Sequence, residues 1–285
     1  MTIFLSPSAA HLRSTLVRAG YHLGRYRIVR YPDGEWTVRL NGPVRGDALV
    51  VGNITPSAES LLELVALVHA LDEAGARVSL AIPHLAFARL DRLTGRGESA
   101  LGVAIARLLA TLPVRRITVL DVHSDAILRA LGPRAKNLSA LSHVAALLRN
   151  VKIDTVVAPD RGALPRARKL AALLPGRVGV AWIEKTRLGP GKTRAEKLHG
   201  TVRGKSVLVV DDMIDSGDTI RTAVRLLGAS GASHMRVAAT HGIFSKGARA
   251  MLARLPIREL IITDSLPQQH RRGLRVIHVA PIVIS

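Results

Sequence analysis

The sequence predicts an α/β protein with mostly parallel sheets flanked by helices. Short apolar runs alternate along the chain with longer segments whose apolar residues recur at helical spacing, and this alternation is typical of βαβ units. Runs such as VLVV at residues 207–210 are apolar throughout, as expected for parallel strands that are buried on both faces. The chain has 285 residues, which is long enough for two domains of ordinary size.

The elements follow from these runs in chain order. Strands are expected at residues 48–52, 77–82, 116–120, 155–158, 178–183, 206–210, 235–240, 259–264 and 275–278. Helices are expected at residues 57–74, 100–110, 125–130, 141–148, 166–173, 219–227 and 247–253. A further strand-like run, residues 26–30, leads into Pro-Asp-Gly at residues 32–34, which is typical of a hairpin turn.

A break near residues 137–150 divides the chain into halves of similar length, so we expect domains at residues 1–143 and 144–285. Each half contains a strand that ends in aspartate and leads into a turn and a helix. These segments are VLDVHSDAIL at residues 119–128 and VVDDMIDSGDTI at residues 209–220. Their similarity indicates two related folds in tandem.

Composition excludes several classes of protein. The chain has no cysteine, which excludes disulfides and thiolate metal sites. No apolar stretch approaches the roughly 20 residues that span a bilayer, and the first residues lack the charged start of a signal peptide. We therefore expect a cytoplasmic protein with no membrane partner.

The net charge of +20, from 41 Lys and Arg against 21 Asp and Glu, attracts phosphates and polyanions alike. The basic residues are scattered, and the sequence has no helix-turn-helix, zinc finger or aromatic RNA-binding strand motif. We therefore interpret the charge as steering of phosphate-bearing substrates and expect no nucleic-acid partner.

The clearest functional motif is the segment at residues 207–220. Its apolar run leads into Asp211 and Asp212, and the turn DSGDT at residues 215–219 precedes a helix. Backbone N–H groups at a helix N-terminus lack partners and lie at the positive end of the dipole, so they can hold a phosphate. The two carboxylates are placed to accept hydrogen bonds from sugar hydroxyls. Together these groups describe a ribose 5-phosphate site.

Other polar clusters follow the remaining strands. They are YPDGE at residues 31–35, the arginine-rich PHLAFARLDRLTGRGES at 83–99, DVHS at 121–124, PDRGA at 159–163 and WIEKTR at 182–187. Arginine forks match phosphate oxygens, and a Lys and an Arg two residues apart on a polar loop suit a mobile lid over transferring phosphates. Taken in order, these motifs, the DSGDT turn, Thr-His-Gly at 240–242 and Thr-Asp-Ser-Leu-Pro at 263–267 resemble the ribose-phosphate diphosphokinase (PRPP synthetase) family.

The resemblance implies two tandem phosphoribosyltransferase-like domains and the transfer of the diphosphoryl group of Mg-ATP to the C1 hydroxyl of ribose 5-phosphate, giving PRPP and AMP. It implies that Asp211 and Asp212 take the ribose hydroxyls, directly or through a metal. It also implies that the 5-phosphate is cradled by Asp215, Ser216, Gly217, Asp218 and Thr219. Self-association, as a dimer or a hexamer, is expected as well.

The same resemblance implies an ATP site. Its members are Tyr31, Asp33 and Glu35 for adenine, across a dimer interface, and Arg89, Asp91 and His123. His123 and Asp160 are the implied Mg²⁺ ligands, and together with waters and phosphate oxygens such a pair suits a hard cation that keeps part of its water shell. Lys185 and Arg187 are the implied catalytic cations that close on the β-phosphate.

Several residues depart from the family pattern, among them Leu90 in place of Gln, Ala163 in place of Gly, Thr186 in place of Arg and Asp218 in place of Gly. The alternatives are therefore a phosphoribosyltransferase, a related pentose-phosphate kinase, or a non-catalytic regulatory subunit. Lys185, Arg187 and the segment 31–35 favour the synthetase, because an ATP-using enzyme needs them and a transferase does not.

Overall fold

The computed structural model describes residues 1–93, 95–187, 193–245, 247–269 and 271–284, with the backbone alone for 185–187 and 193–196. The chain divides into unit 1, Met1–Ser139 with His278–Ser285, and unit 2, Ala140–Ile277. The sequence placed the end of the chain in the second half. In the structure it returns to unit 1, because the helix α9 (Ala280–Val283) packs beside β6 and buries its apolar side chains there.

Unit 1 contains, among its described residues, a parallel sheet of strand order β1-β4-β5-β6-β7. These strands are β1 (Thr2–Leu5), β4 (Asp47–Val51), β5 (Arg77–Ile82), β6 (Ile117–Leu120) and β7 (Ala135–Leu138). Along this sheet the strands follow one another in chain order, so each connection moves in the same direction. A separate antiparallel hairpin, β2 (Tyr26–Arg30) and β3 (Trp36–Leu40), confirms the expected turn at residues 32–34.

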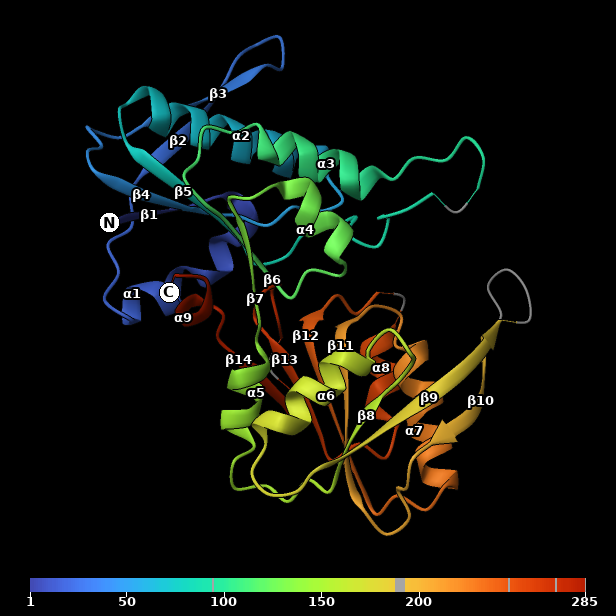
Figure 1. The fold of residues 1–285 in the computed structure, drawn as a ribbon. Helices are drawn as coiled ribbons and strands as arrows, with labels where there is room; N and C mark the ends of the chain where they lie inside the picture. Colours follow the sequence, from blue (N-terminus) through green and yellow to red (C-terminus); the bar gives the residue numbers. More distant parts are fainter. Residues whose placement is uncertain (94, 188–192, 246, 270, 285) are drawn as a thin grey trace. The chain divides into compact units, whose positions relative to one another are not determined.

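Helices cover both faces of the unit 1 sheet (Figure 1). They are η1 (Pro7–Leu12), α1 (Arg13–Arg18), α2 (Ala58–Glu73), α3 (Leu101–Ala110), α4 (Asp125–Leu131) and α9. One apolar core joins α2, α3 and α4 to β4, β5 and β6, through residues such as Leu64, Leu80 and Ile105. Within unit 1, α1 and α9 lie on the opposite side of the sheet from α2 and α3.

Unit 2 contains, in the described part of the chain, a seven-stranded sheet of order β10-β9-β8-β11-β12-β13-β14. The strands are β8 (Thr155–Ala158), β9 (Gly179–Arg187), β10 (Thr193–His199), β11 (Ser206–Ile214), β12 (His234–Gly242), β13 (Glu259–Thr263) and β14 (Leu274–Ile277). Neighbouring strands run parallel except for β9 and β10. The fold class predicted from the sequence is therefore confirmed.

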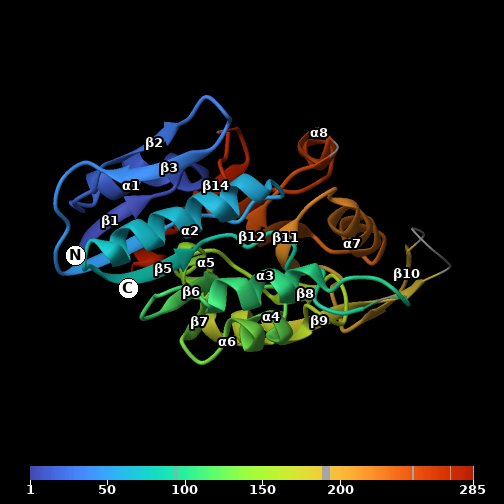
Figure 2. The ribbon, with the colours of Figure 1, turned by 90° about the horizontal axis from the view of Figure 1, so that it is seen from above.

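The helices of unit 2 are α5 (Leu141–Leu147), α6 (Leu164–Leu173), α7 (Asp218–Ala229) and α8 (Ala248–Ala253). Figure 2 shows α6 on one side of this sheet and α7 and α8 on the other. The second core joins α7 and α8 to the central strands, through Val209, Ile220 and Leu252 among others. None of the helices among the described residues of either unit is long and apolar enough to cross a membrane.

The antiparallel pair β9–β10 replaces part of the loop expected after residue 183. Leu198 pairs with Ile183, and the rings of Trp182 and His199 stack with centroids 4.2 Å apart. Glu184 accepts a 2.9 Å contact from His199, which holds the pKa of this carboxyl below its usual range. Charged residues are common on edge strands because they prevent pairing with other chains, and this is why the segment read as a loop.

Candidate functional site

The strand order of unit 2 reverses direction between β8 and β11. From β8 the chain passes through α6 to β9 on one side, and from β11 it passes through α7 to β12 on the other. β8 and β11 are paired in parallel, so their carboxyl ends meet at the same edge of the sheet. In open α/β sheets, ligands bind at such a switch point, and here polar residues follow both strands.

The acidic pair lies within β11, whose ladder continues past residue 210 to Ile214. The expected end of this strand at residue 210 was therefore too early, because the aspartate backbone still pairs with β12. The Asp212 N–H donates to Oδ1 of Asp211, and the Met213 N–H donates to Oδ1 of Asp212, each at 2.9 Å. These bonds fix the orientation of both carboxylates.

Negative charge is concentrated at this edge of the sheet. Burial raises the pKa of the Asp211 carboxyl well above its usual range, and the charges of Asp212 and Asp160 raise it further. Asp160 follows β8, and one of its carboxylate oxygens accepts a 3.1 Å hydrogen bond from the Ala163 N–H at the start of α6. Carboxylates held in this way can accept hydrogen bonds from hydroxyl groups or bind a cation.

The turn between β11 and α7 is held open by a left-handed glycine. Gly217 caps α7 with φ of 80° and ψ of 0°, a conformation that costs any residue with a Cβ atom. A Cβ atom on Gly217 would also lie 2.6 Å from Cε of Met251 and 3.5 Å from Cγ of Leu252. Helix α8 therefore packs against the turn, and the left-handed backbone favours glycine there.

Asp218 is turned toward the first turn of α7. Its carboxylate pairs with Arg221 at 2.5 Å and accepts a 2.8 Å hydrogen bond from the Ser216 hydroxyl. Its charge is thus compensated within its own helix, which explains how a carboxylate is tolerated where a small residue is usual. The first turn of α7 keeps backbone N–H groups directed at the turn, as an anion site requires.

Ser245, in the segment after β12, contacts this turn, and the sequence did not indicate it. Its hydroxyl donates a short hydrogen bond to a carboxylate oxygen of Asp215, 30 residues away in the chain. The Ile243 and Phe244 N–H groups both donate to the carbonyl of Ile214, so the segment after β12 is fixed to the end of β11. No local sequence signal marks Ser245, because the contact depends on the pairing of β11 with β12.

The predicted adenine residues lie at the tip of the β2–β3 hairpin in unit 1. The Tyr31 N–H donates to the Glu35 carbonyl at 2.8 Å, and the Glu35 N–H donates to Oδ1 of Asp33 at 3.0 Å. These bonds close the turn, and all three side chains are exposed. They are available for contact with a molecule outside this hairpin.

Arg89 and Asp91 lie in the segment between β5 and α3. Phe87 has a left-handed φ of 64°, and its carbonyl accepts a 2.7 Å hydrogen bond from the Leu90 N–H. Gly102 permits the close approach of this turn to α3, since a Cβ atom there would lie 2.3 Å from the Phe87 carbonyl oxygen. The result is a fixed turn that leaves the side chain of Arg89 exposed.

His123 follows β6, beside β5, so it lies at the same edge of the unit 1 sheet as the segment of Arg89. Between β6 and His123 the buried Asp121 adopts a left-handed φ of 41° and accepts a 2.9 Å hydrogen bond from Ser139. The Val122 N–H donates to Oδ1 of Asn137. Ser139 and Asn137 were not predicted, and both position the segment that carries His123.

Of the predicted catalytic cations, Lys185 and Arg187 have their backbone in β9, paired with Ala195 and Thr193 of β10. Their side chains, and residues 188–192, lie outside the described part of the chain. Unit 2 thus brings together Asp160, the acidic pair and the turn 215–219, whereas the predicted residues of unit 1 occupy three separate loops.

Comparison with known proteins adds to this geometry. Residues 1–112 match the N-terminal domain of ribose phosphate pyrophosphokinase, and residues 134–264 match the phosphoribosyl transferase domain. A ribose-phosphate pyrophosphokinase from Thermococcus kodakarensis is 34% identical over 265 residues, which cover 92% of this chain and 93% of that protein. The chain belongs to the ribose-phosphate pyrophosphokinase family.

Other members of the family agree over the same length. A ribose-phosphate pyrophosphokinase from Fusobacterium nucleatum is 33% identical, covering 93% of this chain and 85% of that protein. The crystal structure of phosphoribosylpyrophosphate synthetase from Mycobacterium smegmatis superposes with a TM-score of 0.86 at 31% identity, covering 98% of this chain and 95% of that one. The family and the two-domain fold expected from the motifs are therefore confirmed.

Proposed function

We propose that this protein transfers the β,γ-diphosphoryl group of ATP to the C1 hydroxyl of ribose 5-phosphate, giving PRPP and AMP. The observation that carries the proposal is the arrangement at the unit 2 switch point, where an oriented acidic pair and the glycine-capped N-terminus of α7 follow one strand. Membership of the family supports the reaction over the full length of the chain.

Ribose 5-phosphate binds to the segment 211–219 in this proposal. The N–H groups at the start of α7, with the hydroxyls of Ser216 and Thr219, hold the 5-phosphate. The Ser216 hydroxyl, which donates to Asp218 in the structure, turns to the phosphate on binding, while Arg221 keeps the Asp218 charge compensated. Asp211 and Asp212 then accept hydrogen bonds from the ribose hydroxyls and set the direction of the C1 oxygen.

ATP binds to the residues contributed by unit 1. Arg89 offers a guanidinium fork to the phosphates, and Asp91 and His123 complete this part of the site. Tyr31, Asp33 and Glu35 contact adenine from the hairpin tip of a neighbouring subunit, which is why the active protein is an oligomer. The exposure of all three side chains supports this assignment.

During transfer, the C1 oxygen of ribose 5-phosphate attacks the β-phosphorus, the bond from that phosphorus to the oxygen on the α-phosphorus breaks, and AMP leaves. Lys185 and Arg187 stabilise the charge on the transferring group, and closure of the β9–β10 hairpin excludes water. These steps need the substrates to be held in line, which the fixed carboxylates and the capped helix achieve.

Mg²⁺ is the cofactor in this proposal. The donor set fits, because Mg²⁺ binds through one or two carboxylates together with waters and substrate phosphates. Asp160 and Asp211 are close enough for their charges to interact. In the described part of the chain no group of three or more His, Cys, Asp or Glu side chains is placed to hold a metal ion, so the ion would need waters and substrate phosphates as further ligands. Asp160 and His123 would hold the ion, which would neutralise charge on the ATP phosphates.

The test is AMP formation from ATP and Mg²⁺, with and without ribose 5-phosphate, with the sugar product followed by ³¹P NMR. AMP that depends on ribose 5-phosphate, together with a diphosphate signal on C1, is the expected result. Formation of ADP would instead establish a monophosphoryl kinase. Absence of turnover with any pentose phosphate would contradict the proposal and favour a transferase or a regulatory subunit.

A further inference from the structure

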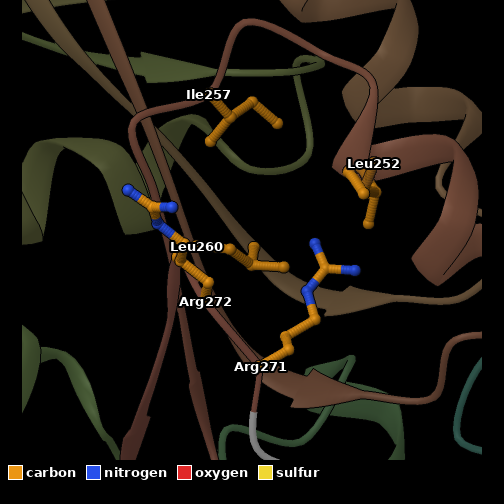
Figure 3. Close-up of a pocket in the computed structure, with 7 residues that line it drawn as sticks. Leu252, Ile257, Leu260, Arg271 and Arg272 are labelled. Carbon is orange, nitrogen blue, oxygen red and sulfur yellow. The ribbon is translucent and has the colours of Figure 1, made fainter.

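A cavity of about 340 Å³ lies in unit 2, away from the switch point, beside α8, β13 and β14. Figure 3 shows its lining. Leu252, Ile257 and Leu260 form an apolar wall, and two consecutive arginines, Arg271 and Arg272, come from the segment that enters β14. The volume is at the lower end of the range of about 300–1,000 Å³ that is usual for small-molecule sites.

The two guanidinium groups lie on opposite sides of Leu260. Arg271 points toward Leu252, whereas Arg272 lies on the side of Ile257 (Figure 3). Apolar side chains and charged guanidiniums in one cavity suit a ligand that has an apolar body and an anionic group.

The positive charge around this cavity is not neutralised by its described lining, which contains no carboxylate. The carboxylate of Glu259 does not compensate the charge of Arg271 or Arg272, because it pairs with Arg275 at 2.7 Å and with Arg236 at 3.4 Å. Arg249, whose carbonyl accepts a hydrogen bond from Arg271, keeps its Nη1 buried without a hydrogen-bond partner among the described residues. Burial lowers the pKa of Arg249, and the charge of Arg271 lowers it further.

The cavity is in contact with the turn 215–219 through one side chain. Leu252 of α8 lines the cavity, and the same side chain packs at the position where a Cβ atom of Gly217 would lie, at 3.5 Å. A ligand that displaces or fixes α8 would therefore act directly on the cap of α7.

We propose that this cavity is a binding site for a small phosphomonoester with an apolar body, whose phosphate is held by Arg272 and whose body packs on Leu252, Ile257 and Leu260. The site is distinct from the turn 215–219, and binding there requires no catalytic turnover. Its occupancy changes the affinity of the turn for ribose 5-phosphate through α8.

Phenyl phosphate is a suitable probe, because it combines one phosphate with one ring. Its binding to the full-length protein is measured by titration calorimetry in the presence of saturating ribose 5-phosphate, which occupies the turn. Binding that persists under these conditions, and that is tighter than binding of inorganic phosphate or phenol alone, is expected. Binding that disappears when ribose 5-phosphate is present, and that Ala253→Phe leaves unchanged when it is absent, would place the probe at the substrate turn and overturn the proposal.

Two variants locate the probe. Arg272→Gln removes an exposed guanidinium and is expected to weaken phenyl phosphate binding roughly tenfold or more, since a hydrogen bond to a charged group is lost. Ala253→Phe fills the cavity from the exposed end of α8 and is expected to abolish binding. The matched control is Arg258→Gln, which removes the same charge from an exposed residue outside the lining.

The control should bind the probe as the unchanged protein does. Equal weakening by Arg258→Gln and Arg272→Gln would show a general effect of charge and would contradict the assigned site. The coupling is measured separately, as the change in the Kd of ribose 5-phosphate when phenyl phosphate is added. That change should vanish in Ala253→Phe, and a change that persists in this variant would contradict transmission from the cavity.

Discussion

Units 1 and 2 are built from the same kind of parallel sheet, yet they differ in strand order. In unit 1 the strands of the sheet follow the chain, from β1 through β4, β5 and β6 to β7. In unit 2 the order reverses between β8 and β11, so the loops after these two strands diverge and leave room for a ligand. This difference in strand order supports placing the proposed ribose 5-phosphate residues in unit 2 rather than in unit 1.

The ends of β6 in unit 1 and β11 in unit 2 also differ. β6 stops at Leu120, and the following Asp121 turns into a buried left-handed position where it binds Ser139. β11 continues through its two aspartates, and its turn reaches α7 through Gly217. Similar strand–Asp–turn–helix sequences therefore give a structural aspartate in one unit and an oriented acidic pair in the other.

The largest effect is expected in the β9–β10 hairpin, which has no counterpart in the described sheet of unit 1. Lys185→Ala should lower kcat by roughly 100- to 1,000-fold, because a cation that stabilises transition-state charge is lost. The Kd of ribose 5-phosphate should change little. Steady-state kinetics and calorimetry measure the two quantities, with Lys197→Ala, an exposed residue of the same hairpin, as the control. Unchanged turnover would rule out this role for Lys185.

The two aspartates at related positions should behave differently. Asp212→Asn is expected to weaken ribose 5-phosphate binding roughly 10- to 100-fold, since hydrogen bonds to a charged acceptor are lost. Asp121→Asn should leave that affinity almost unchanged, because Asp121 is bound to Ser139 within unit 1. Titration calorimetry measures the Kd of ribose 5-phosphate for both variants. A similar loss of affinity in both would contradict the different roles assigned to Asp212 and Asp121.

A smaller effect separates two glycines that share a left-handed backbone. Gly247→Ala, at a residue with φ of 74° and ψ of 12°, meets no atom within 4 Å and should cost about 1–2 kcal/mol, the strain of the conformation alone. Gly217→Ala meets Cε of Met251 at 2.6 Å, and because this atom is the end of a flexible side chain that can turn away, the further cost should be about 1 kcal/mol or less. Denaturant unfolding compares the variants, and equal costs would mean that α8 does not constrain the turn.

The smallest effect concerns Glu63, a buried residue of α2 in unit 1. Burial raises the pKa of its carboxyl, and the charge of Glu59 raises it further. A raised folded-state pKa means that the ionised group destabilises the fold above the unfolded-state pKa. Glu63→Gln should therefore raise Tm by roughly 1 °C at pH 7. This gain in Tm should shrink as the pH falls toward 4.5, the usual pKa of Glu. Calorimetry at several pH values measures it, and a lower Tm for the variant at pH 7 would contradict the prediction.

Most central elements could be predicted from the sequence, because parallel strands such as β8 and β11 are buried on both faces and read as apolar runs. β7 could not, since two of its four residues, Lys136 and Asn137, are exposed at the edge of the sheet. The acidic pair and the turn 215–219 were found from one continuous segment. The hydrogen bond from Ser245 to Asp215 and the charge interaction of Asp160 with Asp211 were not, because they depend on strand pairing across distant parts of the chain.

The return of the chain to unit 1 has a consequence for its synthesis. Ala280, Ile282 and Val283 of α9 are buried in unit 1, beside β6, although more than a hundred residues of unit 2 separate them from Ser139. Domains generally fold as the ribosome releases them, from the N-terminus onward. Unit 2 can therefore fold while unit 1 still lacks part of its core, and the unit that begins first is completed last.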